Sequence, residues 1–504
     1  MVVEVMISRI QQVVRQNALR LPGMHLTGFM NSFWQNGRLP AWILFGFIVL
    51  AGCLSTTNAR HSAIDSLFHE YDHMDAPGCA VAVYENRERQ LSRAYGIANL
   101  DYGIPLSDSS RFHMASLSRQ LTAAAVGVQI VRGEIDPVDP VSDYLENWPE
   151  WAADVRIRHL LYHTSGLPDL FSLMKVAGIS INDVLTLEDY VALIQNGAPL
   201  RFDPGSRRKR SSADYTLLAR IVEVSSNTSF SDFVAEEVLE PLGMTETHFH
   251  DDRYRNIPNR VISYEPASPN EATPAQTRSD TGYVEDDGRK PVPPYRQIYP
   301  GNFQGVGHLG LYSSIRDWRH WEDYLNGTDF SLEMDSVRSL LTKEVEVVDG
   351  RLVQPLGMEV ASWQGMDRSG ESDHFYGFQV DMRRYPEHGL ATLVLCNRAD
   401  ADPAEKSRSL ARMFLKEHLE AYLAPYAGLY YNDELDVVYE LLVEDGALVL
   451  DRRLSPRGIM TEEKPNIWSA GSWEFLFQRD EQSEEVEGFL ISTGRVREVK
   501  FIKK

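Results

Sequence analysis

The chain has 504 residues, of which 43% are hydrophobic, 10% aromatic and 24% charged. This composition is typical of a globular protein large enough for two or three hydrophobic cores, and it excludes a disordered or fibrous chain. Seventy-two acidic residues against fifty basic residues give a formal net charge of -22, which repels nucleic-acid phosphates and argues against nucleic-acid binding.

An apolar stretch, residues 40–52, lies near the start of the chain and is followed directly by Cys53. The stretch is too short to span a bilayer but has the length of the hydrophobic region of a signal peptide. Small residues just before a cysteine match the cleavage site of bacterial lipoproteins, after which the cysteine carries acyl chains. The alternative is an uncleaved signal anchor with an incidental cysteine. Both alternatives predict an exported protein, and the first predicts a lipoprotein anchored through Cys53 at the periplasmic face of a membrane.

Hydrophobic spacing predicts a helix and two strands directly after this region. We assign residues 1–52 to the signal peptide region and residues 53–62 to a linker. Residues 63–73 carry apolar side chains on one helical face, and strands are predicted over residues 79–84 and 90–95.

A second helix is predicted over residues 116–132, where apolar residues recur at helical spacing and Gly133 stands at the expected C-terminal position. Ser116 is then the first residue of this helix. A hydroxyl there lies beside backbone N–H groups and the positive end of the helix dipole, which suits a nucleophile whose product is an oxyanion. The same position also suits an ordinary helix N-cap.

Six segments, spread over much of the chain, share the order of the landmarks of one enzyme family. They are FHMASLSRQLTAAAV (112–126), IRHLLYHTSGLPD (157–169), FDPGSRRKRSSADYTLLARIVE (202–223), EPLGMTETHF (240–249), VGHLGLYSSIRDWRHW (306–321) and YGFQVDMRRYPEHGLATLVLCNRADADP (376–403). The first resembles the signature in which a nucleophilic serine is followed three residues later by lysine. The chain thus resembles the β-lactamase-related serine hydrolases, which include class C β-lactamases, penicillin-binding proteins and D-alanyl-D-alanine carboxypeptidases.

The resemblance implies an α+β fold for residues 63–420, with an antiparallel sheet flanked by helices and an all-helical part. Beyond this domain, residues 425–504 contain short alternating strands with turn residues between them, which predict a small antiparallel β-barrel. This segment is similar to the lipocalin-like module that accompanies some of these hydrolases. Residues 264–299 are rich in Pro, Ser, Asp and Thr without periodicity, and they predict a long loop at the rim of the cleft.

The resemblance also places the family's catalytic motifs on residues that lack the expected chemistry. Ser116 keeps the nucleophile position, but the lysine that should follow is Arg119, whose guanidinium keeps its proton at any physiological pH. In the Tyr-x-Asn motif, Arg210 replaces the tyrosine and Ser212 replaces the asparagine. An ungapped count places Glu371 where the third motif has lysine or histidine, so a cation has become an anion.

Two arginines and one carboxylate therefore stand at motif positions of the predicted site where the family has other residues. We expect Arg119, Arg210 and Glu371 to form a paired network, or the arginines to bind an anionic ligand, because unpaired buried charges are costly. His374 lies close to this motif, and a shifted loop would bring it into the site as a base. The basic run at residues 207–210 borders the predicted cleft, and its alternative interpretation is a solvated surface loop.

The remaining candidate ligand residues do not indicate a cofactor. His248 and His250 would share one face of a strand, but they lie in a family segment that binds no metal, so we predict neither a metal site nor a cofactor. Cys79 and Cys396 fall in strands predicted to be central to the sheet. We expect them to be buried free thiols rather than a disulfide.

Two functions fit these residues. The first is a catalytically impaired binding protein that holds a peptide, a peptidoglycan fragment or another small anionic ligand in the cleft. The second is an active serine hydrolase of esters, amides or D-amino-acid peptides, in which His374 or the substrate itself activates Ser116. We favour the first function, because Arg119 and Arg210 stand where the family has its proton acceptors.

Overall fold

The computed structural model describes residues 60–504 apart from residues 87, 268–292, 299–303, 328–329, 344, 349–350, 354–355, 453–454 and 481. The chain divides into two compact units, Met1–Ala63 and Ile64–Lys504. Of the first unit only residues 60–63 are described, and they are helical. Cys53 and the expected signal region lie outside the described residues. Within the described part of the chain, the helices are too short or too polar to cross a membrane.

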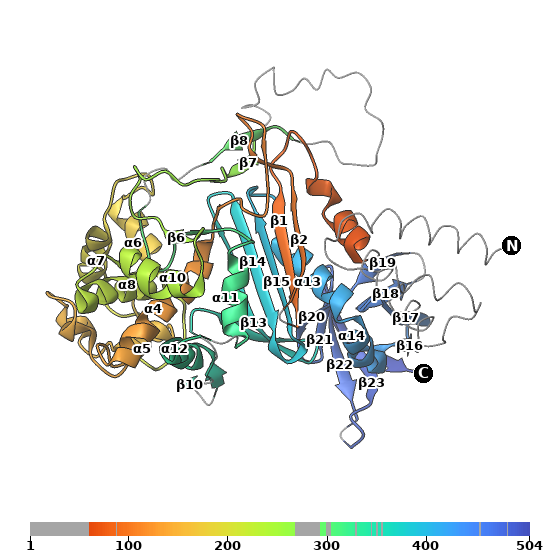
Figure 1. Cartoon of the computed structure of the whole chain (residues 1–504). Coiled ribbons are helices and arrows are strands. Elements are labelled where there is room, and N and C mark those ends of the chain that lie inside the picture. Colours follow the sequence, from red (N-terminus) through yellow and green to blue (C-terminus); the bar gives the residue numbers. More distant parts are fainter. Residues whose placement is uncertain are drawn as a thin grey trace, which may run out of the picture. The chain divides into compact units, whose positions relative to one another are not determined.

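The larger unit contains a six-stranded antiparallel sheet with the strand order β12-β13-β14-β15-β1-β2 (Figure 1). Helix α11 (Trp318–Leu325) packs on one face of this sheet and helix α13 (Pro403–Phe414) on the other, which explains why strand β1 is buried along most of its length. The strands predicted near residues 79 and 90 are β1 and β2. The six strands are β1 (Cys79–Glu85), β2 (Glu88–Tyr95), β12 (Glu359–Trp363), β13 (Met366–Phe375), β14 (Phe378–Tyr385) and β15 (Leu390–Cys396).

A disulfide joins Cys79 to Cys396, so the expectation of two free thiols was wrong. The two cysteines lie directly opposite each other on the antiparallel strands β1 and β15, with Cα atoms 4.0 Å apart. Both side chains are fully buried. Sequence patterns placed both residues in central strands, but the register between strands so far apart in the chain is set by the tertiary fold.

Ser116 lies in a 3-10 turn, η3 (Ala115–Leu117), that leads into helix α4 (Ser118–Arg132). Gly133 ends the helix in a left-handed conformation with φ 76°, as expected from the sequence. Ser116 does not cap the helix, because the N-cap position is Leu117 and has no side-chain hydrogen bond. Ala115 has φ 45°, a conformation that is costly for a residue other than glycine and that shapes the turn presenting Ser116.

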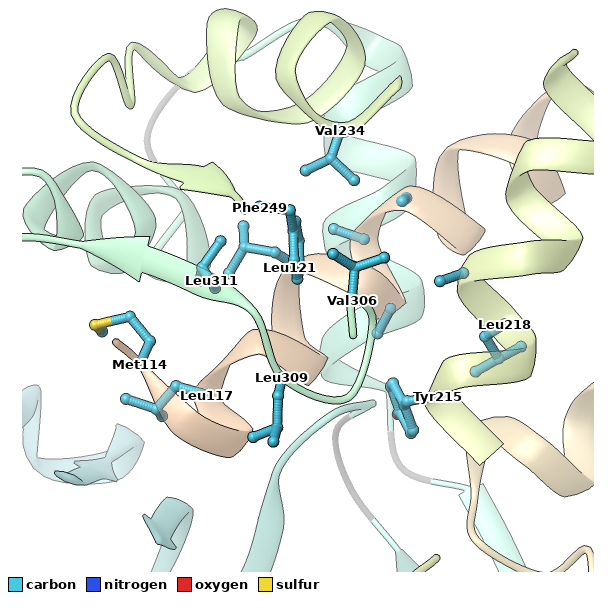
Figure 2. Close-up of a cluster of buried hydrophobic side chains, with 14 of the residues drawn as sticks. Met114, Leu117, Leu121, Tyr215, Leu218, Val234, Phe249, Val306, Leu309 and Leu311 are labelled. Carbon is cyan, nitrogen blue, oxygen red and sulfur yellow. The ribbon is translucent and has the colours of Figure 1, made fainter. Parts of the chain in front are cut away.

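Hydrophobic packing holds this turn in place. The start of α4 packs with helix α8 (Ser212–Ser226) and with the segment that leads into strand β9 (Leu311–Ser313). Each fully buried leucine in such a core contributes about 1.5–3 kcal/mol relative to an exposed one. Among the residues of this core that Figure 2 labels, Met114, Leu117 and Leu121 come from the η3 turn and its flanks, and Leu309 and Leu311 come from the β9 segment.

Further helices and small antiparallel sheets complete this domain. The helices are η2 (His69–Tyr71), η4 (Val141–Asp143), η5 (Glu150–Ala152), α5 (Ile157–Leu161), α6 (Leu170–Ala177), α7 (Leu187–Gln195), α9 (Phe230–Val234), η6 (Ala235–Leu239, a π-helical turn), α10 (Glu240–Leu242), α12 (Leu332–Thr342), η7 (Pro386–His388), α14 (Lys416–Leu423) and η8 (Ala424–Tyr426). The paired strands are β3 (Ile97–Asn99) with β4 (Ile104–Pro105), β9 with both β5 (Phe112–His113) and β6 (His248–Phe249), and β10 (Val345–Val348) with β11 (Arg351–Val353).

The region expected to be one long loop, residues 264–299, has two short paired strands at its ends. They are β7 (Tyr264–Pro266) and β8 (Tyr295–Gln297). Most of the segment between them, residues 268–292, lies outside the described residues. The expectation of an unbroken loop was therefore wrong at both ends of the segment.

The C-terminal segment forms a separate nine-stranded antiparallel sheet, which confirms the predicted small β-barrel. Its two edge strands are β19 and β20, and Met460 alone separates them in the sequence, so the sheet is curled into a nearly closed barrel. Aromatic side chains, including Tyr430 and Trp468, fill its core. The nine strands are β16 (Gly428–Asn432), β17 (Val437–Glu444), β18 (Ala447–Arg452), β19 (Ser455–Ile459), β20 (Thr461–Lys464), β21 (Ile467–Ala470), β22 (Trp473–Arg479), β23 (Val486–Thr493) and β24 (Val496–Lys503).

Three buried histidines surround Tyr312 in the sheet formed by β5, β9 and β6. The rings of His113, His248 and His250 lie 5.3, 5.9 and 5.6 Å from the Tyr312 ring. Burial lowers their pKa values to about 3, about 3 and about 4, respectively, so all three are neutral at pH 7. Among the described residues, no group of His, Cys, Asp and Glu side chains is arranged to hold a metal ion.

These histidines predict acid sensitivity. A histidine whose pKa is lowered by folding binds a proton more readily in the unfolded chain, so stability falls as the pH drops below 6.5 and continues to fall toward the folded pKa. For His248, whose folded pKa is about 3, the loss at pH 5 is about 2 kcal/mol. Thermal melts of a His248→Phe variant between pH 7 and pH 5 should therefore show a smaller drop than wild type. Val176→Ala, which changes an exposed side chain that does not titrate, is the control and should leave the drop unchanged.

The disulfide predicts a defined thiol count. In a Cys53→Ser variant, Cys79 and Cys396 are the two cysteines left in the chain. Titration of the denatured variant should find no free thiol before reduction and two after it. Changing both to Ala should lower the free energy of unfolding by about 2–5 kcal/mol. Two free thiols in unreduced protein would contradict the assignment.

Candidate active-site cleft

The hydroxyl of Ser116 is held by an aspartate that sequence reasoning did not select. Ser116 Oγ donates a short hydrogen bond to Asp373 Oδ2, and the backbone N–H of Ser116 donates to the same oxygen over 3.1 Å. Asp373 lies on β13, next to the strand end that faces the η3 turn. One carboxylate oxygen thus accepts hydrogen bonds from both the hydroxyl and the backbone N–H of Ser116. This N–H is the group that would bind an oxyanion formed at Ser116.

Arg119 lies one helical turn after Ser116 and is buried, with 5% of its surface exposed. Its Nη2 forms an ion pair with Glu371 Oε2 at 2.5 Å, and its Nε donates to the Ser116 carbonyl over 3.3 Å. Glu371 is equally buried and lies on β13. The arginine therefore occupies the expected lysine position as a permanently charged group that is already paired.

Arg210 completes this ion-pair network from the segment before α8. Its Nη1 lies 2.9 Å from Glu371 Oε1 and 3.1 Å from Glu359 Oε1, and its Nη2 donates to Ser116 Oγ over 3.4 Å. Burial raises the pKa of Glu371, while Arg119 and Arg210 act in the opposite direction. The structure thus joins Arg119, Arg210 and Glu371 in the network expected from the sequence and adds Glu359 to it.

A second polar chain leads from Arg119 into the helical part. Arg119 Nη1 lies 3.3 Å from His163 Nε2, and His163 Nδ1 lies 2.7 Å from Asp214 Oδ2. Because a guanidinium only donates, His163 Nε2 must accept and Nδ1 must carry the proton. Burial and the charge of Arg119 lower the pKa of His163 well below its usual value, which is consistent with this neutral form.

Ser212 and His374 lie at the cleft but do not reach Ser116. Ser212 Oγ donates to Asp169 Oδ2 over 2.5 Å, and the backbone N–H of Ser212 donates to the same oxygen over 3.1 Å. His374 is exposed, and no hydrogen bond among the described residues joins it to Ser116. Strand alternation turns residue 374 away from the side that carries 371 and 373. The expectation that a loop shift would make His374 the base is not met, because residues 371–374 lie in an unbroken strand.

These side chains surround a cavity of about 270 Å³. Ser116 and Asp373 lie at one side of it, and the rings of Phe171 and Phe375 line it as well. A separate hollow of about 10 Å³, room for about one water molecule, lies between Arg119, Glu371 and Arg208. The larger cavity is lined by Ser116, Arg119, Asp169, Phe171, Arg210, Ser211, Ser212, His308, Leu309, Asp373, His374 and Phe375.

The basic run at residues 207–210 divides into two parts. Residues 207–209 are exposed, and the guanidinium of Arg207 lies over the Phe202 ring at 5.1 Å. Arg210 points into the cleft and is paired there. The surface-loop interpretation therefore describes residues 207 and 209, while Arg208 is exposed but borders the small hollow and Arg210 belongs to the site.

Sequence reasoning missed two charged residues that contact the predicted site, Asp373 and Glu359, and four cavity-lining residues, Asp169, Phe171, His308 and Phe375. A signal for Asp373 was present, because side chains two positions apart in a strand share a face, so Asp373 had to accompany Glu371. No comparable signal existed for Glu359, which reaches Arg210 from the neighbouring strand β12.

Comparison with known proteins finds one family along most of this domain. Residues 64–415 match the family model described as Beta-lactamase. Penicillin-binding protein 4* of Bacillus subtilis is 33% identical over 206 residues, which are 41% of this chain and 45% of that protein. A D-aminopeptidase of Brucella anthropi is 25% identical over 325 residues, which are 64% of this chain and 57% of that protein. The chain thus spans about half the length of these curated relatives.

Two solved structures have a similar fold. The penicillin-binding protein homologue from Pyrococcus abyssi, described as octameric, has a TM-score of 0.56 and 18% identity over 88% of this chain and 99% of its own. The D-amino acid amidase from Ochrobactrum anthropi has a TM-score of 0.56 and 16% identity over 71% of this chain and 99% of its own. These likenesses confirm the fold expected from the sequence.

The ion-pair network predicts that Glu371 is essential for stability. Changing Glu371 to Gln leaves Arg119 buried without its counter-charge, and breaking a buried pair costs about 3–5 kcal/mol. Urea unfolding should show this loss, whereas Glu359→Gln, at an exposed partner of Arg210, should cost less than about 1 kcal/mol.

The double variant Arg119→Met, Glu371→Gln tests the pairing itself. Removing both charges should recover part of the stability that Glu371→Gln loses. Additive losses in the double variant would show that the two side chains are not coupled.

Proposed function

Since this chain belongs to the β-lactamase family, we propose that it is a catalytically impaired hydrolase that binds a peptide or a cell-wall fragment in the cleft. One observation carries the proposal: the Asp373 carboxylate accepts hydrogen bonds from both the hydroxyl and the backbone N–H of Ser116. Attack by Ser116 on a carbonyl would place the new oxyanion near this N–H, where it would meet a negative charge.

The lack of an ordinary base supports the same proposal. Within the described residues, the side chains hydrogen-bonded to the Ser116 hydroxyl are Asp373 and Arg210. Arginine keeps its proton, and Arg119 and Arg210 are fixed by Glu371. A serine nucleophile requires a partner that removes its proton. Among the residues that the structure describes, Asp373 is the one candidate base at hydrogen-bond distance, and its carboxylate occupies the oxyanion position while it holds the hydroxyl.

The names of the relatives support a peptide-like ligand. They include a penicillin-binding protein and D-aminopeptidases. The cavity of about 270 Å³ is close to the lower end of the usual range for small-molecule sites, so it fits one amino-acid-sized group of such a ligand.

We also propose that the protein is exported and held to a membrane at the periplasmic face by acyl chains on Cys53. The apolar stretch before Cys53 supports this proposal. The disulfide between Cys79 and Cys396 adds independent support, because disulfides persist mainly in oxidising compartments.

Covalent labelling tests the loss of catalysis. The purified chain, incubated with an activated ester and a fluorescent penicillin, should form no adduct on Ser116 that mass spectrometry detects. Labelling or turnover that disappears in Ser116→Ala would overturn the proposal and would identify an active serine hydrolase with Asp373 as the base.

A restored variant provides the positive arm of the test. Arg119→Lys, Arg210→Tyr and Glu371→His together return three of the expected motif residues, while Ser212 is left in place, and Asp373→Gly clears the N–H of Ser116. This variant should gain measurable labelling of Ser116 by the same reagents, provided that thermal melts show it to be folded. The variant without the Asp373→Gly change is the matched control and should gain less.

A further inference from the structure

The charges around the cavity are unequally paired. Both arginines, Arg119 and Arg210, form ion pairs with glutamates. Asp169 and Asp373 also line the cavity, but among the described residues neither has a cationic partner within ion-pair distance. Their hydrogen bonds come from serine residues. The cavity therefore keeps an excess of negative charge.

Neighbouring basic residues do not cancel this excess. Burial lowers the pKa of His308 to about 3, so it is neutral at pH 7. Arg208 lines the small hollow beside Glu371 rather than the cavity. Although burial raises the pKa of Asp169, hydrogen bonds from Ser212 and Ser172 outweigh this effect and hold the pKa below its usual value, so the group is ionised.

Asp373 also has a second carboxylate oxygen that can accept a hydrogen bond from a ligand. Both of its hydrogen bonds from Ser116 reach Oδ2, whereas Oδ1 accepts none from the described residues. Asp373 is half-buried and lines the cavity, so a ligand bound there lies beside its carboxylate. The rings of Phe171 and Phe375 line the same cavity. Carboxylates and aromatic faces both attract an organic cation.

We propose that the cleft selects a small ligand with an ammonium group, which forms an ion pair with Asp373 inside this cavity. The proposal rests on the proposed function, because it names the ligand class of the same cleft. It also reverses the charge expected from the sequence. An anionic ligand was expected because two arginines occupy family motif positions. In the structure, however, both arginines form ion pairs with Glu371. An anion in the cavity would therefore lie beside the carboxylates of Asp169 and Asp373.

Three probes of one shape and different charge test this selectivity. Benzylamine is a cation at pH 7, benzyl alcohol is its neutral counterpart and benzoate is its anionic counterpart. Calorimetric titration of the full chain at low ionic strength should show benzylamine binding at least about tenfold more tightly than benzyl alcohol, and benzoate binding more weakly than both.

Two variants locate the effect. Asp373→Asn keeps the shape of the side chain and removes its charge. It should weaken benzylamine binding about tenfold and leave the affinity for benzyl alcohol unchanged. Asp367→Asn is the matched control, because Asp367 is an exposed carboxylate on the same strand β13 and does not line the cavity. It should bind all three probes as wild type does.

The outcomes separate this proposal from the proposed function. Equal or tighter binding of benzoate, no detectable binding of benzylamine, or unchanged benzylamine binding in folded Asp373→Asn would each overturn ammonium selectivity. The fluorescent penicillin assay on the same preparations reports catalysis independently. Labelled Ser116 together with benzylamine selectivity would overturn the loss of catalysis but leave the ligand class standing.

Discussion

The buried ion pair between Arg119 and Glu371 is the interaction on which the rest of the cleft depends. It connects the first turn of α4 to strand β13, so it ties the helix that follows Ser116 to the sheet. Arg119 and Glu371 are both buried, and burying a charged side chain is very costly in free energy unless it is paired with an opposite charge. Arg210 joins through the second oxygen of Glu371, and His163 joins through Arg119. Every one of these groups therefore has a fixed place before any ligand arrives.

How much of this site the sequence predicts depends on how local each relation is. The position of Arg119 follows from the three-residue spacing after Ser116, which is one helical turn. Glu371 was placed by an ungapped count back from Gly377, and the structure has a tight turn between β13 and β14, in which Phe375 pairs with Phe378, and puts Glu371 in ion pairs with Arg119 and Arg210. The fold was predictable for a similar reason, since several landmark segments occur in the family's order.

The features that sequence reasoning missed depend on contacts between distant segments. The disulfide requires Cys79 and Cys396 to stand in register on adjacent strands, 317 positions apart in the sequence. Glu359 reaches Arg210 from a different strand. Asp373 is an intermediate case: alternation places it on the face of Glu371, but its contact with Ser116 depends on how the η3 turn packs against β13. Periodicity therefore assigns a face, and only the tertiary fold assigns a partner.

The turn that presents Ser116 does not by itself determine the chemistry of the site. Ala115 keeps a costly conformation and the surrounding leucines keep the turn buried, yet both follow from packing in the hydrophobic core. On β13, two carboxylates two positions apart have different surroundings. Glu371 forms ion pairs with both arginines, whereas Asp373 accepts hydrogen bonds from Ser116 and lines the cavity without an ion pair among the described residues. Because Glu371 is buried in ion pairs, Asp373 is the carboxylate of this strand that a ligand in the cavity meets. The fold alone predicts neither role.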